Sequence, residues 1–160
     1  MTLSKPIYEN KADFDNEQRM ANFLAEKWNC QMLRQKKMSQ FDFIAHRNER
    51  PVAFLEFRRR HHNMHDYKTV IISMTKLVAW HSAKGITGLP CLFVVEWDDY
   101  IAYSEIDDFV SHGDFRISKK SNNRRNDYDD QEVVAYYLTE RFKILEKKDV
   151  QSNKPTASWP

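Results

Sequence analysis

The sequence predicts a mixed α/β fold, of the α+β kind with a mixed sheet, in one domain. At 160 residues the chain is long enough to bury a substantial core and no longer than one ordinary domain. A helical pattern near the N-terminus is followed by strand-like segments with turn residues between them. The continuous apolar run Cys91–Trp97 is typical of a central strand buried on both faces.

The first predicted helix covers Phe14–Asn29 and follows a polar arm at residues 1–12. Its apolar positions share one helical face, and they are Met20, Phe23, Leu24 and Trp28. Asp13 or Asp15 is a suitable capping residue for its start. Strands are predicted next at Gln31–Gln35, Phe41–Arg47 and Val52–Arg58. The turn signal Asn48-Glu49-Arg50-Pro51 predicts that the last two pair as an antiparallel hairpin.

A second helix is predicted over Asp66–Lys84, with Gly85 ending it in the left-handed conformation common after helices. Its inward stripe comprises Val70, Ile71, Met74, Leu77 and Val78. The central strand Cys91–Trp97 then pairs with Ile101–Ile106 across an acidic turn.

The remaining segments are polar or short. Residues 111–130 predict a basic loop, Val133–Leu138 a last strand, and Glu140–Lys147 a closing helix or extension. The tail from Asp149 is polar and predicts disorder. We therefore expect a single domain over residues 13–148, flanked by an arm and a disordered tail.

Composition excludes several classes of protein. The chain has only three glycines, too few for a Gly-rich nucleotide-binding loop. Cys30 and Cys91 lie far apart in apolar settings, which favours reduced thiols over a disulfide or a zinc pair. No apolar run is long enough to span a bilayer, and the N-terminal residues have no hydrophobic signal core. We expect no membrane association and a cytoplasmic location.

The net charge of +2 conceals strong segregation. Residues 34–60 hold eight basic and three acidic residues, and residues 116–125 hold five basic residues and no acid. Residues 96–108 hold six acids and no Lys or Arg. Two basic blocks favour a polyanionic partner, although each block alone is also compatible with a solvated loop.

Three polar residues lie on the predicted hairpin. Asp42 is near the start of one strand, and Glu56 and Arg58 are two residues apart at the end of the next, so they point to the same side. An acid in such a buried strand needs a partner. Two carboxylates, with Glu17 as a possible third, form a hard-oxygen site suited to Mg²⁺ or Mn²⁺. A plain ion pair of Arg58 with Asp42 or Glu56 explains the same residues.

At these residues the chain resembles the PD-(D/E)XK nuclease superfamily, in particular its small phage-encoded members. The resemblance covers roughly residues 14–145. It is carried by an ordered set of motifs: Phe41-Asp42-Phe43, Phe54-Leu55-Glu56-Phe57-Arg58-Arg59-Arg60, Tyr67, Ile72-Ser73, Lys76, Gly88-Leu89-Pro90, Arg125-Asn126-Asp127 and Asp130-Gln131-Glu132.

The resemblance implies a restriction-endonuclease-like core, in the order helix, antiparallel strands, helix and strand. It also implies hydrolysis of nucleic-acid phosphodiester bonds with a divalent metal. Carried onto this sequence, it makes Asp42 and Glu56 metal ligands and Glu17 an outer ligand. Gln40 stands where the family pattern has proline.

The main departure is Arg58, which stands where the family pattern has lysine. Arginine stays charged at any working pH, so it stabilises negative charge but is a poor general base. Lys76 and the neighbouring Arg59 and Arg60 are candidates for the missing role. Otherwise the protein is catalytically impaired.

Further basic residues are candidates for nucleic-acid binding, namely Arg59, Arg60, His61, Arg124 and Arg125. His61, His62 and His65 indicate either a phosphate-facing loop or, less well, a zinc site. Arg124 and Arg125 indicate either a phosphate clamp or a solvated loop.

Two hypotheses follow. The first is a phage-encoded, Mg²⁺- or Mn²⁺-dependent nuclease that acts on duplex, branched or single-stranded DNA in the host cytoplasm, with a homodimer as a possible assembly. The second is a non-catalytic relative that binds nucleic acid or protein.

Overall fold

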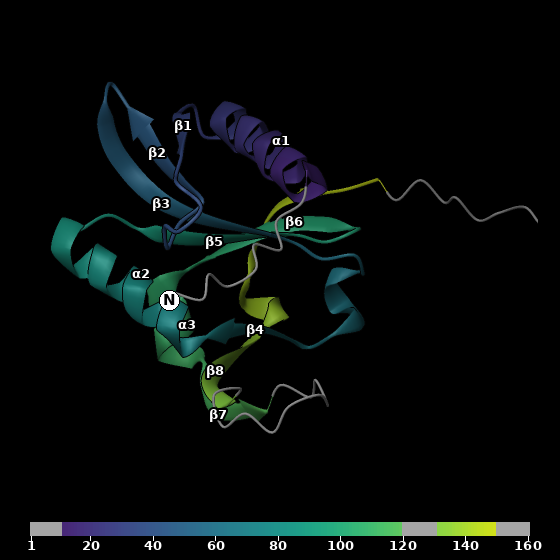
Figure 1. Cartoon of the computed structure of the whole chain (residues 1–160). Coiled ribbons are helices and arrows are strands. Elements are labelled where there is room, and N and C mark those ends of the chain that lie inside the picture. The colour runs from purple at the N-terminus through teal and green to yellow at the C-terminus, as the bar shows by residue number, and fades with distance from the viewer. Residues whose placement is uncertain (1–10, 120–130, 150–160) are drawn as a thin grey trace, which may run out of the picture.

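The structure is a computed structural model that describes residues 11–119 and 131–149. Its centre is a six-stranded sheet in the order β1-β2-β3-β5-β6-β9. Helix α1 covers one face of this sheet, and α2, α3 and a three-stranded sheet (β4-β8-β7) cover the other (Figure 1). The mixed α/β class predicted from the sequence is therefore confirmed.

The first half of the chain builds one edge of the large sheet. Helix α1 (Lys11–Lys27) leads into β1 (Gln31–Arg34), β2 (Phe43–Arg47) and β3 (Arg50–Arg59), which pair antiparallel in succession. Asn48 and Glu49 have positive φ angles of 48° and 63°, the conformation of the tight turn that suits a hairpin. The predicted hairpin is confirmed. Asp13 lies within the first turn of α1, so neither it nor Asp15 caps the helix.

The parallel pairing of β3 with β5 (Cys91–Glu96) places the predicted central strand next to the hairpin. Strand β6 (Tyr100–Glu105) follows as its antiparallel partner, and β9 (Lys143–Lys147) closes the sheet. Val94 and Val95 are fully buried on opposite faces. This confirms that the continuous apolar run is a strand covered on both sides.

The helix predicted over Asp66–Lys84 is wrong in its first half. A short 3₁₀ turn, η1 (Met64–Asp66), leads into strand β4 (Thr69–Ser73), and helix α2 covers Met74–Thr87. Val70 and Ile72 are buried while Ile71 is exposed, which is the two-residue period of a strand. The apolar positions of a short strand joined to a helix resemble one long helical stripe.

The end of α2 also differs from the prediction. Gly85 lies inside the helix, and Gly88, with a φ of 71°, ends it. The Gly88 amide donates a hydrogen bond to the carbonyl of Lys84, as expected for a glycine after a helix.

The predicted loop over residues 111–130 is wrong in its described part. Helix α3 (Ile106–His112) and strand β7 (Asp114–Lys119) occupy it, and residues 120–130 lie outside the described residues. Strand β8 (Gln131–Leu138) is not the last strand, because the 3₁₀ turn η3 (Thr139–Arg141) and β9 follow it. A short, largely polar strand such as β7 has a weak sequence signal, because pairing with the neighbouring strand rather than periodicity stabilises it.

Two apolar clusters fill the space on either side of the large sheet. Met20 and Leu24 of α1 pack on Leu55 and Phe57 on one side. The other cluster is centred on Trp80. Cys30 and Cys91 are free thiols, as predicted. The predicted arm and tail fall almost entirely outside the described residues. None of the helices in the described ranges has the length and apolar composition needed to cross a bilayer.

Candidate active site

Asp42 immediately precedes β2 and is bonded to β3 through backbone and side chain. Its amide donates to the carbonyl of Leu55 (3.0 Å), and its carboxylate Oδ2 accepts from the amide of Phe57 (2.8 Å). These two bonds bracket Glu56 on the neighbouring strand. The hairpin register therefore brings the two predicted carboxylates together.

Glu56 is a buried carboxylate, only 2% exposed, on the face of β3 that meets Lys76 of α2. Its Oε1 lies 2.6 Å from Nη2 of Arg58, and the same oxygen accepts a hydrogen bond from the ammonium of Lys76 on α2. Burial raises the pKa of Glu56 above its usual value, and the negative charge of Asp42 raises it further, against the lowering effect of Arg58 and Lys76. Burial and Asp42 thus disfavour the ionised form of Glu56, and the two cations favour it.

Alternation along β3 separates the basic residues that follow Glu56. Arg58 shares the Glu56 face, whereas Arg59 points to the α1 face. There Arg59 lies 3.1 Å from Glu96 and 2.5 Å from Asp98. Of the three cations considered for the missing lysine role, Lys76 is the one that contacts Glu56.

Glu17 lies on the α1 side of the sheet. Its Oε2 is 2.7 Å from Nη1 of Arg34 on β1, and the Arg34 guanidinium stacks over Phe14 and Phe43. The sequence does not predict that Arg34 is the partner of Glu17, because nothing in the spacing indicates that β1 meets α1. Glu17 also lines a cavity of about 250 Å³ that includes Arg58 and His61.

Asp42 and Glu56 are suited to a divalent cation by their chemistry. Two carboxylates that repel each other across adjacent strands, one of them buried, form the hard-oxygen environment that Mg²⁺ and Mn²⁺ prefer. Within residues 11–119 and 131–149, no group of three His, Cys, Asp or Glu side chains converges closely enough to hold a metal.

The histidines after β3 are dispersed. Nδ1 of His62 lies 2.8 Å from the Asn63 carbonyl, and His65 packs edge-on against Tyr100. In the described part of the chain they form no metal-holding group, which counts against the zinc interpretation. Arg124 and Arg125 lie outside the described residues.

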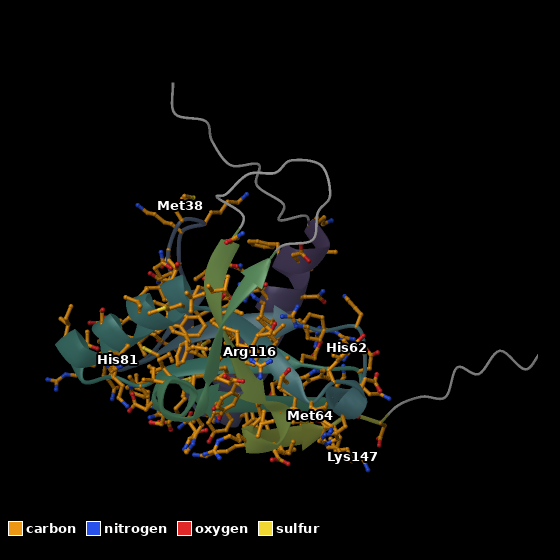
Figure 2. All side chains as sticks on the ribbon, turned by 90° about the horizontal axis from the view of Figure 1, so that it is seen from below. Met38, His62, Met64, His81, Arg116 and Lys147 are labelled. Atoms are coloured by element: carbon orange, nitrogen blue, oxygen red, sulfur yellow. The ribbon has the colours of Figure 1, made fainter. Side chains whose placement is uncertain are left out.

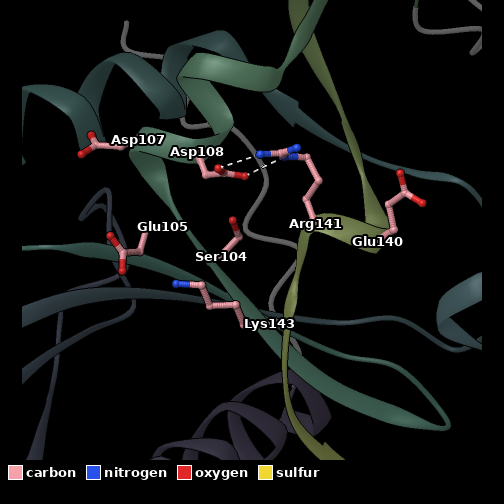
Figure 3. A pocket seen from close by; sticks show the side chains of 7 residues that line it. All are labelled: Ser104, Glu105, Asp107, Asp108, Glu140, Arg141 and Lys143. Carbon is pink, nitrogen blue, oxygen red and sulfur yellow. Dashed lines mark hydrogen bonds and ion pairs between the residues drawn. The ribbon is translucent and has the colours of Figure 1, made fainter.

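A separate cavity of about 680 Å³ lies between β6, α3, η3 and β9 (Figure 3). Its lining is acidic and polar, and comprises Ser104, Glu105, Asp107, Asp108, Glu140, Arg141 and Lys143. Asp108 accepts two hydrogen bonds from Arg141 (2.9 and 3.1 Å) and one from the buried Tyr137 hydroxyl. Its hydrogen bond from Arg141 lowers the pKa of Asp108 to about 2. The four acids in this lining disfavour binding of a polyanion here.

One family of known proteins and one solved structure are similar to this chain. The family described as "Phage putative PDDEXK endonuclease" matches residues 3–145. A solved structure of Hjc, a Holliday junction resolvase from the archaeal hyperthermophile Archaeoglobus fulgidus, superimposes with a TM-score of 0.49 at 9% identity. That comparison covers 82% of this chain and 90% of the other. No protein with a curated description matches the sequence.

Proposed function

Because the chain belongs to the phage PDDEXK endonuclease family, we propose that it hydrolyses DNA phosphodiester bonds with the help of Mg²⁺ or Mn²⁺. The observation that carries the proposal is the buried Glu56 carboxylate beside Asp42, contacted by two cations at one oxygen. A purely structural ion pair needs one partner and no second acid.

Asp42 and Glu56 would hold the metal, which lowers the pKa of a bound water and neutralises charge on the phosphate when it is present. The amide of Phe57 holds the Asp42 carboxylate in place. Glu17 is proposed as an outer ligand through water, from the other side of the strand end. A location in the host cytoplasm and a homodimeric assembly belong to the same proposal.

Lys76 and Arg58 divide the work that one lysine performs in the family pattern. Lys76 is held beside Glu56 by α2 and packs near the Trp80 ring, so its ammonium can orient the attacking water next to the carboxylate. Arg58 is 40% exposed and always charged, which suits it to stabilise negative charge on the phosphate. Arg59, paired with Glu96 and Asp98, acts by positioning the end of β3.

The test is cleavage of labelled duplex, branched and single-stranded DNA with Mg²⁺ or Mn²⁺. Asp42→Ala should abolish cleavage, and Lys76→Ala should reduce it about a hundredfold or more, the usual contribution of a group that assists proton transfer. Lys84→Ala is the matched control, since Lys84 lies on the same helix but pairs with Asp107. Cleavage that is equal in Lys76→Ala and Lys84→Ala would remove Lys76 from the mechanism.

A non-catalytic DNA-binding module is the second candidate, because Arg58 and Lys76 already satisfy Glu56 in the absence of a metal. This alternative predicts DNA binding that is independent of divalent metal and no cleavage of any substrate. It also predicts that Asp42→Asn leaves DNA affinity unchanged. Cleavage that requires both Asp42 and metal excludes it.

A further inference from the structure

A basic cavity of about 560 Å³ opens beside the proposed active site, on the Glu56 face of the sheet. Arg60 extends into it two residues beyond Arg58, and the two guanidinium groups are close enough to affect each other. The rest of its wall comes from the segment after β3, from β4 and from the end of β5. Its lining includes His61, His62, Met64, Tyr67, Ile71 and Trp97.

Arg60 carries a charge that the described residues leave without an acidic partner. The neighbouring Arg58 and Arg59 each form ion pairs with carboxylates. Within residues 11–119 and 131–149, Arg60 forms none. Burial and the charge of Arg58 lower the pKa of Arg60. A half-buried cation held in this way favours binding of an anion from outside the chain.

The opposite wall is aromatic and apolar. Tyr67 is 62% exposed and Ile71 is 46% exposed, and the His62 ring packs edge-on against Tyr67 at 4.8 Å between centroids. A phosphate needs no such wall, whereas a nucleobase does, because every base has a face that stacks on aromatic side chains.

The loop that forms the cavity is held in place before any ligand arrives. The amide of Arg60 donates to the carbonyl of Glu96 (2.8 Å), and the carbonyl of His62 accepts from the amide of Asp98 (3.0 Å). The amide of Met64 donates to Asp99 Oδ1 (2.8 Å). Figure 2 shows His62 and Met64 together at one end of the molecule, away from Met38 and His81. The cavity is therefore preorganised.

We propose that this cavity binds one unpaired nucleotide of the DNA substrate, with its phosphate on Arg60 and its base against Tyr67 and Ile71. The proposal rests on the proposed function, since it places this nucleotide next to the phosphate that Arg58 contacts. Bases inside a continuous duplex are stacked and cannot enter a cavity. The substrate class is thus DNA with an unpaired nucleotide beside the cut, such as a single-stranded extension or a flap.

The test compares the affinities of a blunt duplex and of the same duplex with a short single-stranded extension. Fluorescence anisotropy is measured with a chelator present, so that the DNA stays intact. Wild type should prefer the extended DNA about tenfold, the effect of stacking one base on an aromatic ring. Tyr67→Ala should remove this preference without weakening blunt-duplex binding, while Tyr67→Phe should retain it. Arg60→Gln should weaken binding of the extended DNA more than that of the blunt duplex.

Two control variants keep the result specific. His65→Ala removes a nearby exposed ring that does not line the cavity, and Lys68→Ala removes a nearby exposed charge. Both should keep the wild-type preference for the extended DNA. Circular dichroism should show that each variant is folded.

The proposal is overturned if wild type shows no preference, or if Tyr67→Ala weakens both DNAs equally. It is also overturned if Arg60→Gln weakens both DNAs equally, because the phosphate of the unpaired nucleotide would then not be held by Arg60. Cleavage with Mg²⁺ is measured separately. A Tyr67-dependent preference without any cleavage would contradict the nuclease activity and leave the nucleotide cavity standing.

Discussion

At the scale of single residues, the site depends on how Glu56 is charged. Its raised pKa has two causes, burial and the Asp42 carboxylate, and two cations act in the opposite direction. Only ionised Glu56 can bind a divalent cation. In a plot of cleavage rate against pH, the rate should fall on the acid side as Glu56 takes up a proton. This acid limb should lie at higher pH than it would for a glutamate with an ordinary pKa.

Arg58→Gln tests this interpretation by moving the acid limb. Arg58 lowers the pKa of Glu56, so its removal should raise that pKa and shift the limb of the pH–rate profile to higher pH. The rate at the plateau should also fall, since Arg58 is proposed to stabilise charge on the phosphate. Lys84→Gln should leave the limb where it is. A limb that moves to lower pH in Arg58→Gln would contradict the assignment to Glu56.

At the scale of elements, Glu96 joins α1 to the large sheet. This carboxylate is 1% exposed, accepts two hydrogen bonds from Arg19 (2.9 and 2.5 Å) and lies 3.1 Å from Nε of Arg59. This pairing adds a polar contact between α1 and the sheet to the apolar packing of Met20 and Leu24.

Glu96→Ala should lower the free energy of unfolding by about 2 kcal/mol, because it takes a buried carboxylate away from the mostly buried Arg59, whereas Arg19 is 52% exposed and regains water. Asp98→Ala removes the more exposed partner of Arg59 and should cost less than about 1 kcal/mol. Urea unfolding measures both. Equal losses of unfolding free energy in the two variants would mean that burial of Glu96 adds nothing to its contribution to stability.

Gly85, inside α2, and Gly88, directly after it, provide a matched pair. Gly85→Ala should stabilise the protein by about 1 kcal/mol, because alanine is the better helix former and its Cβ would meet no described atom within 4 Å. Gly88→Ala should destabilise it by about 1 kcal/mol, because its φ of 71° is strained for any residue with a Cβ. Thermal unfolding measures both changes. The opposite order would place the helix end at Gly85.

The sequence predicts each element only where its pattern is unambiguous. The hairpin, the central strand and α1 were predictable, because periodicity and turn residues mark them independently of their neighbours. Strand β4 was not, because Val70, Ile71 and Met74 also fit a helical period. Only pairing with β8 selects the extended conformation there.

At the scale of the whole molecule, charge is divided between two regions. The strand end around Arg58 and Arg60 is basic, and the cavity around Asp108 is acidic. Asp108 connects α3 to η3 through Arg141 and also accepts from Tyr137. Its low pKa makes this connection sensitive to acid.

Stability should fall as the pH drops from about 4 toward about 2 because of Asp108. A folded-state pKa of about 2, below the ordinary aspartate value of 3.8, means that the unfolded chain takes up the proton first. The contribution is therefore fully present above pH 4 and lost on the way to pH 2. Asp108→Asn should flatten this part of the curve of unfolding midpoint against pH, and an unchanged curve would contradict the role assigned to Asp108.

The residue types of the site are determined by the sequence itself: Asp42, Glu56 and the arginine in the lysine position are visible as a motif on two adjacent strands. Which cation serves Glu56 is decided only by the tertiary structure. Along the chain, Arg59, Arg60 and Lys76 are all candidates for the role that Arg58 does not fill. Strand alternation turns Arg59 toward Glu96, and the packing of α2 brings Lys76 to Glu56. Local patterns specify which way a side chain can point, whereas contacts between distant elements specify what it meets.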